Sequence, residues 1–137
     1  MKYPIIIFFL ILILSGSAMA EPAVIVNESV PVDELSRDDV KQIFTGKKRS
    51  WENGDIIVAV VLKSGQTHES FLKNFIQKSR VQFRTYWKKM VFTGKASALK
   101  EFGSESELVA FVASTKGAIG YIDSASPHTG VKVLSIK

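Results

Sequence analysis

Residues 56–76 read IIVAVVLKSGQTHESFLKNFI, and this stretch decides the fold. Its first part, Ile56 to Leu62, is a continuous apolar run rich in β-branched side chains, which is typical of a strand buried on both faces, usually a parallel one. Its last part carries four large apolar residues at helical spacing, namely Phe71, Leu72, Phe75 and Ile76. The stretch therefore predicts a buried strand, a short polar loop and an amphipathic helix.

The polar loop between this strand and this helix contains the candidate binding residues. They are Lys63, Ser64, Gly65, Gln66 and Thr67. The first backbone N–H groups of a helix have no partner within the helix, and the helix dipole favours negative charge there, so such a loop can hold an anion. Lys63 adds a positive charge. In the alternative interpretation, Ser64 or Thr67 only caps the helix.

The first twenty residues have the features of a secretory signal peptide. Lys2 precedes an apolar run from Ile5 to Leu14, and Ala18-Met19-Ala20 forms an A-x-A cleavage pattern before Glu21. The apolar run is shorter than the roughly 20 residues that a spanning helix needs, although an uncleaved anchor is the alternative. We therefore expect residues 1–20 to be removed and a mature protein, periplasmic or secreted, with no further transmembrane segment.

The remaining chain has the length of one domain, residues 21–137, and it lacks cysteine, which excludes disulfides and thiolate metal sites. Further strands are expected at 23–26, 118–122 and 131–136, and further helices at 36–44, 81–91 and 104–112, with a loop at 96–103. The expected class is α/β, a small sheet of mostly parallel strands flanked by helices. Ligand sites in such sheets lie at the carboxyl ends of strands, where the polar loop follows Leu62.

Several side chains mark where individual elements begin, end or pack. Ser36 with Asp39, and Ser104 with Glu107, match capping boxes, and Gly46 can end a helix in the left-handed conformation. Gly120, inside a predicted strand, indicates close approach of a backbone or a ligand. Four apolar residues of the 81–91 helix have the spacing of a core face rather than of a ligand platform, namely Phe83, Trp87, Met90 and Val91.

Several segments resemble the phosphate-binding proteins of phosphate ABC transporters. In chain order they are Val24 to Asn27, Leu35 with Ile43-Phe44-Thr45-Gly46-Lys47 and Trp51, Ser64-Gly65-Gln66-Thr67, and Gly117-Ala118-Ile119-Gly120-Tyr121. The segment from Tyr86 to Lys95 is more similar to a small exported subfamily of these periplasmic-binding-protein-like domains. The resemblance spans almost the whole mature chain. It implies a single lobe of a type II periplasmic-binding-protein-like fold.

The resemblance also implies a binding role for the polar loop. In the family, a Ser-Gly-Thr loop at a helix N-terminus holds phosphate through hydroxyls and backbone N–H groups, and Ser64, Gly65 and Thr67 match it. Gln66 is inserted, and the arginine and aspartate of the family have no counterpart. Lys63 can supply charge, but without the two-pronged geometry of arginine. The family has two lobes, so one lobe would leave the anion half solvated unless a partner protein or second copy supplied the missing wall.

Two functions remain open. The first is an exported solute-binding module for phosphate or a related anion, acting with a transporter or another partner. The second is an envelope interaction domain that keeps the fold without the anion site. The formal net charge of +5, or +4 once Lys2 is removed, suits an anionic ligand, and no basic-aromatic module for nucleic acid is present.

An enzyme is not expected, and no cofactor or metal is expected either. Two segments match the S-x-x-K pattern of penicillin-recognising enzymes, Ser70–Lys73 and Ser97–Lys100, but no Lys-Thr-Gly partner motif accompanies them. His68-Glu69 lacks the second histidine of a zinc-binding helix, and His128 is the only other histidine. The residues therefore provide no catalytic triad.

Overall fold

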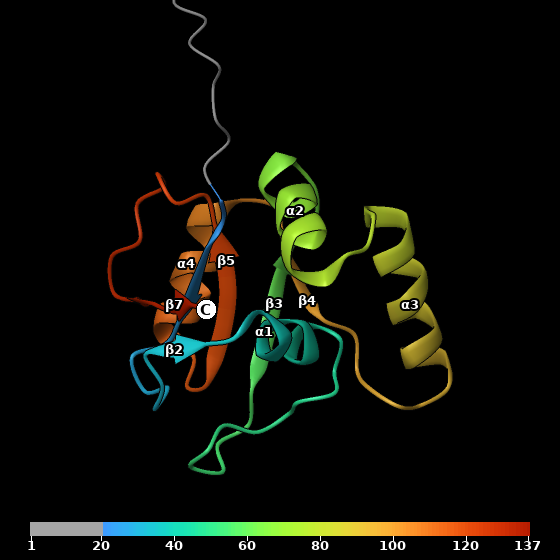
Figure 1. Cartoon of the computed structure of the whole chain (residues 1–137), viewed down its shortest axis with the longest axis horizontal. Coiled ribbons are helices and arrows are strands. Elements are labelled where there is room, and N and C mark those ends of the chain that lie inside the picture. The colour runs from blue at the N-terminus through green and yellow to red at the C-terminus, as the bar shows by residue number, and fades with distance from the viewer. Residues whose placement is uncertain (1–20) are drawn as a thin grey trace, which may run out of the picture.

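The computed structural model describes residues 21–137, so the predicted signal peptide lies outside the described residues. The elements, shown in Figure 1, are β1 (Ala23–Val26), β2 (Glu34–Leu35), α1 (Arg37–Phe44), β3 (Val58–Leu62), α2 (Gln66–Phe71), the π-helical segment η1 (Leu72–Ile76), α3 (Arg80–Phe92), β4 (Lys100–Phe102), α4 (Glu105–Ser114), β5 (Ala118–Ile122), β6 (Lys132–Val133) and β7 (Ser135–Ile136). No helix within 21–137 is long and apolar enough to cross a membrane.

The main sheet has the strand order β4-β3-β5-β1-β6. Strand β3 is parallel to both of its neighbours, β4 and β5, whereas β1 runs antiparallel to β5 and to β6. All strands of this sheet except β1 therefore point in one direction, which confirms the predicted α/β class with a mostly parallel sheet. Helix α4 packs on β1, β3 and β5.

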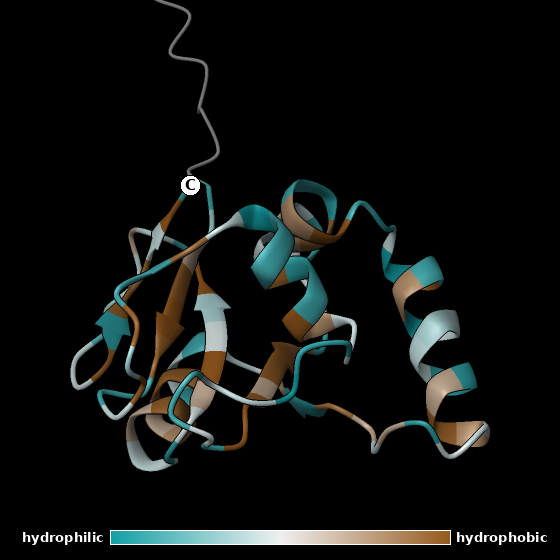
Figure 2. Ribbon diagram, turned by 60° about the horizontal axis from the view of Figure 1, so that its bottom comes forward, coloured by the Kyte–Doolittle hydropathy of each residue, from teal (hydrophilic) through white to brown (hydrophobic). Residues whose placement is uncertain are grey.

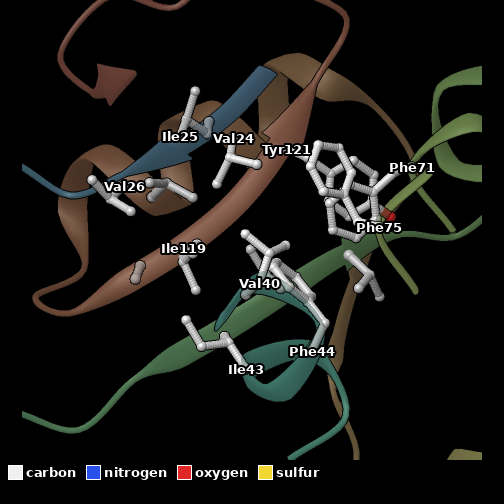
Figure 3. Close-up of a cluster of buried hydrophobic side chains, with 14 of the residues drawn as sticks. Val24, Ile25, Val26, Val40, Ile43, Phe44, Phe71, Phe75, Ile119 and Tyr121 are labelled. Carbon is white, nitrogen blue, oxygen red and sulfur yellow. The ribbon is translucent and has the colours of Figure 1, made fainter. Parts of the chain in front are cut away.

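The core lies between the central strands and the helices. Every residue of β5 is buried, as are the last three residues of β3. Figure 3 shows Val40, Ile43 and Phe44 of α1 beside Val24 of β1 and Ile119 of β5, with the rings of Phe71 and Phe75 close by. The apolar faces predicted for α1 and for the helix after the polar loop are thus the faces that build the core.

Two predictions about strands were wrong. Residues 96–103 were expected to form a loop, but β4 lies within them, at the sheet edge, where its exposed Lys100 and Glu101 give no apolar signal. Residues 131–136 were expected to form one strand, but they divide at Leu134. Strand β6 pairs with β1 in the main sheet, and β7 pairs with β2 in a second sheet of two strands.

The predicted helix boundaries agree closely with the structure. Ser36 and Asp39 form a complete capping box, with Asp39 N donating to Ser36 Oγ at 3.0 Å and Ser36 N donating to Asp39 Oδ2 at 3.2 Å. Ser104 Oγ accepts from Glu107 N at 3.2 Å, although no return bond from the Glu107 side chain forms within 21–137. Gly46 follows α1 with a φ of +76°, the left-handed conformation that was predicted.

We expect Ser36→Ala and Ser104→Ala each to lower the free energy of unfolding by about 1 kcal/mol, because each removes a helix cap. The two losses should be similar, since each variant removes one acceptor, and the return bond from Ser36 N to Asp39 Oδ2 does not need the serine side chain. Urea denaturation measures both losses. Ser97→Ala is the matched control, because Ser97 is exposed and caps no helix. An equal loss of stability in all three variants would contradict the assignment of Ser36 and Ser104 as helix caps.

The helix predicted at 81–91 begins one residue earlier and is capped by Ser79, which accepts from Gln82 N at 3.1 Å. Its inner face was predicted only in part. Phe83 and Trp87 are buried, whereas Val91 is exposed, so the core assignment of Val91 was wrong. Trp87 Nε1 donates to Phe44 O at 3.1 Å, which fixes α3 to the end of α1.

Candidate anion-binding site

The polar loop lies where the sequence predicts it, between the carboxyl end of β3 and the first residue of α2. Lys63 N donates to Phe102 O at 2.9 Å, so the start of the loop is attached to the end of β4. Gln66 is the first residue of α2. The predicted order of strand, loop and helix is therefore confirmed, but β3 begins at Val58 rather than at Ile56, which is exposed.

Gly65 occupies the N-cap position of α2, with φ +100° and ψ 173°. Side-chain-bearing residues rarely adopt this conformation, so the backbone itself requires glycine at this position. No side chain caps the helix, and Thr67 lies within its first turn. The alternative prediction that Ser64 or Thr67 caps the helix was therefore wrong, because a glycine with positive φ takes the N-cap position.

The candidate residues face solvent. Lys63, Ser64, Gly65 and Gln66 are exposed, and Thr67 is half-buried. Within residues 21–137 neither the Ser64 nor the Thr67 hydroxyl has a hydrogen-bond partner, and Lys63 forms no ion pair. The loop thus places two hydroxyls, one ammonium group and a helix start without a side-chain cap within a short segment at the protein surface.

Directly after the loop, His68 is buried, with only 4% of its surface exposed. Its Nδ1 is hydrogen-bonded to Tyr121 Oη, which also accepts a hydrogen bond from Leu62 N at 3.0 Å. The Tyr121 ring stacks on Phe71 with ring centroids 3.8 Å apart. This network joins the end of β3, the first turn of α2 and the central strand β5, and it therefore holds the polar loop in place.

Both titratable groups of this network are held neutral. Burial, with a smaller contribution from Arg80, lowers the pKa of His68 from 6.5 to about 4, and burial raises the pKa of Tyr121. Tyr121 Oη accepts from Leu62 N–H, and within residues 21–137 His68 Nδ1 is the only acceptor in contact with this hydroxyl, so we assign the phenol hydrogen to the bond with His68 Nδ1. The proton of the neutral imidazole is then on Nε2.

A cavity of about 990 Å³ lies beside the loop, between α3 and the end of β3. Lys63 and His68 line it together with Arg80 and Arg84, which the sequence analysis did not identify. Their four-residue spacing on one face of a helix was the available signal. No group of three or more metal-ligating side chains occurs in the described part of the chain.

Three solved structures share this fold at low sequence identity. An ABC-type phosphate transport receptor from Vibrio cholerae matches with a TM-score of 0.58 and 18% identity, over 85% of this chain and 46% of that one. PstS from Borrelia burgdorferi gives 0.64 and 18%, over 85% and 47%. A protein from Clostridium perfringens, solved with bound phosphate, gives 0.64 and 21%, over 85% and 44%. The chain spans about half the length of these structures.

No curated protein matches this sequence. A family model described as the PBP superfamily domain matches residues 18–135, which is most of the chain. The observed α/β lobe agrees with this match, and it is also the fold that the resemblance implied. The chain therefore belongs to the family of PBP superfamily domains, and its fold is that of phosphate ABC transporter substrate-binding proteins over about half of their length.

Proposed function

We propose that this protein is an exported solute-binding module that holds phosphate or a related small anion on the loop from Lys63 to Thr67. The observation that carries this proposal is the start of α2, where Gly65 leaves the helix without a side-chain cap and where the hydroxyls of Ser64 and Thr67 have no hydrogen-bond partner within residues 21–137. The first N–H groups of a helix have no partner within the helix itself, and the helix dipole favours an anion beside them. Bound phosphate in the related Clostridium perfringens structure supports phosphate as the first ligand to test.

The residues of the loop would contribute unequally to binding. The backbone N–H groups at the start of α2 supply directional donors, and Gly65 lets the anion approach them without a side chain in the way. The Ser64 and Thr67 hydroxyls add hydrogen bonds to a charged acceptor, each worth about 1.5–3 kcal/mol. Lys63 is exposed, so its attraction is screened by water and by salt.

The openness of the loop limits its affinity. An anion on this loop keeps part of its hydration, and the high dielectric of water weakens each electrostatic contact. We therefore propose that a partner, either an envelope protein such as a transporter component or a second copy of the chain, covers the loop when binding is tight. The protein alone should bind phosphate weakly.

We expect Ser64→Ala and Gly65→Val to weaken phosphate binding more than Lys63→Ala does at moderate salt. The first removes a donor, the second blocks the approach to the helix start, and the third removes only a screened charge. Calorimetry with phosphate, sulfate and a phosphate ester at two ionic strengths measures the losses. Ser97→Ala, an exposed serine in the segment before β4, is the control and should bind as the unmutated protein does.

The same titration separates the two candidate functions. A ligand that binds only the native state raises the melting temperature by mass action. If the unmutated protein shows neither heat nor a thermal shift with any of these anions, alone or with a candidate partner, the envelope interaction domain replaces the solute-binding module.

A further inference from the structure

The cavity beside α3 has an apolar interior. Its walls come from the end of β3, the inner face of α3 and the segment before β4, and their large apolar residues include Val61, Leu62, Phe83, Trp87 and Leu99. Figure 1 shows α3 standing apart from the sheet, beyond α2. The position of α3 is fixed at the end of α1, where Trp87 Nε1 bonds Phe44 O and Tyr86 Oη donates to Thr45 O at 2.6 Å. A volume of about 990 Å³ is large enough for a small organic molecule.

One buried polar group opens into this cavity. His68 lines it, and Nδ1 of His68 is already bonded to Tyr121 Oη. Nε2 has no hydrogen-bond partner within residues 21–137, yet no buried side-chain nitrogen there is left unsatisfied, so Nε2 reaches the cavity surface. Because the proton of the neutral ring is on Nε2, His68 presents an N–H donor to whatever occupies the cavity.

The charged groups around the cavity are almost all positive. Arg80 and Arg84 lie one helical turn apart on α3, and neither forms an ion pair with another residue of 21–137. Both line the same cavity as His68, and their charges disfavour its protonation, which contributes to its lowered pKa. Lys63, Lys88 and Lys89 add positive charge, and Glu101 is the one carboxylate that the described residues contribute to the lining. The lining therefore offers donors and cations to an acceptor-rich ligand.

The mouth of the cavity is apolar as well. Val91 and Phe92 line it at the C-terminal end of α3, and Phe92 is 93% exposed. Figure 2 shows this end of α3 in the hydrophobic colour. An inorganic ion would gain no binding energy from this apolar surface. A ligand with a hydrocarbon or aromatic part would bury the surface and gain binding energy from the hydrophobic effect.

We propose that this cavity binds a small organic anion: a carboxylate, sulfonate or phosphate ester whose head bonds His68 Nε2, Arg80 and Arg84, and whose aryl or alkyl body packs on Phe83 and Trp87. The two guanidinium groups suit a planar or tetrahedral oxyanion, because each can form two parallel hydrogen bonds. This site goes beyond the proposed phosphate loop. It uses different donors and shares only Lys63 with that loop.

Hexyl phosphate is the probe, compared with inorganic phosphate and hexanol in calorimetric titrations of the purified protein. We expect hexyl phosphate to bind at least about tenfold more tightly than either, because only hexyl phosphate supplies both the charged head and the apolar body. Trp87 lines the cavity and Trp51 does not, so a change in tryptophan fluorescence should accompany binding.

Two pairs of variants test where the probe binds. Arg80→Gln/Arg84→Gln should weaken hexyl phosphate about tenfold or more, whereas Lys47→Gln/Lys73→Gln, with the same change in net charge at exposed sites outside the cavity, should not. Ala98→Trp should obstruct the cavity, whereas Ala110→Trp, on the exposed side of α4, should leave binding unchanged.

The proposed phosphate site on the loop and the proposed organic-anion site in the cavity can be tested independently. Ser64→Ala should leave hexyl phosphate binding intact while weakening inorganic phosphate. Equal losses in the two charge-matched double variants, or hexyl phosphate no tighter than phosphate, would overturn the cavity assignment. Binding to vesicles of phosphatidylglycerol without binding of the monomeric probe would also overturn it, in favour of a membrane surface.

Discussion

Gly117→Ala is expected to lower the free energy of unfolding by roughly 3–5 kcal/mol, more than either helix-cap variant. Gly117 has a φ of +76°, in which a side chain is strained, and a Cβ added there would lie 2.3 Å from Ile56 O. That oxygen belongs to the backbone, so no side-chain rotation can relieve the overlap. The backbone around one of the two residues must move instead.

Movement of Gly117 would disturb three other contacts. Its carbonyl oxygen accepts hydrogen bonds from Trp51 Nε1 at 2.9 Å and from Val58 N at 3.1 Å, and its N–H donates to Ser29 Oγ at 3.2 Å. The first of these bonds holds a buried tryptophan against the start of β5, and the second begins the pairing of β3 with β5. The cost of the substitution is therefore shared by the loop and the sheet.

Gly54→Ala is the matched control for Gly117→Ala. Gly54 has a similar φ of +87°, but a Cβ there would meet no atom within 4 Å. The decrease in the free energy of unfolding of Gly54→Ala therefore measures the conformational strain alone, about 1–2 kcal/mol. Urea denaturation of both variants separates strain from overlap, and equal losses would show that the Ile56 carbonyl can move aside without cost.

The two glycines of the Gly117–Tyr121 segment show what a sequence can and cannot reveal. Close approach at Gly120 was predicted correctly, but the approaching group was expected to be a backbone or a ligand, and it is neither. In the structure a Cβ on Gly120 would lie 2.7 Å from Leu108 Cδ2, so the approach is that of α4 side chains. A single residue type signals crowding, and the identity of the neighbour depends on a helix folded elsewhere.

Elements with strong local signals were predictable, and elements defined by their partners were not. Ser36 and Gly46 act on backbone groups a few residues away, so their effect is encoded locally. Strand β4 exists because Val60, Val61 and Leu62 supply a parallel neighbour for Lys100–Phe102. The three residues of β4 carry no apolar alternation of their own, and no local pattern could have revealed them.

The candidate site also has a part that the local sequence predicts and a part that depends on distant partners. The loop from Lys63 to Thr67 follows an apolar run and precedes a helical face, so its place at the end of a strand was predictable. The partner of His68 is Tyr121, 53 residues further along the chain, and their contact depends on the pairing of β3 with β5. The cavity depends in addition on where α3 packs.

The pH dependence of stability gives the second large effect. We expect the free energy of unfolding to fall by about 3 kcal/mol through His68 alone as the pH falls from 6.5 to 4, since one pKa unit corresponds to about 1.4 kcal/mol. In this window the unfolded chain binds a proton at His68, while burial keeps the folded imidazole neutral. The contribution is complete above pH 6.5 and is lost as the pH falls towards the folded pKa.

His68→Gln should remove this part of the pH dependence, and His128→Gln should keep it. The two variants share all carboxylates and differ only in which histidine remains, and His128 is exposed. Denaturation curves at pH 4, 5, 6 and 7 give the slopes directly. Equal slopes in the two variants would show that His68 titrates in the folded protein as it does in the unfolded chain.

The charged residues near His68 allow a second test of why its pKa is lowered. Burial is the largest cause of the lowered pKa of His68; Arg80 and Arg84 on α3 add to it, and Glu69 opposes it. Arg80→Gln/Arg84→Gln should therefore reduce the slope between pH 4 and 6.5 without abolishing it, because the burial by α2 and β5 remains. A slope as small as that of His68→Gln would assign the lowered pKa to the two arginines instead, and an anion bound between them would then control the protonation of His68.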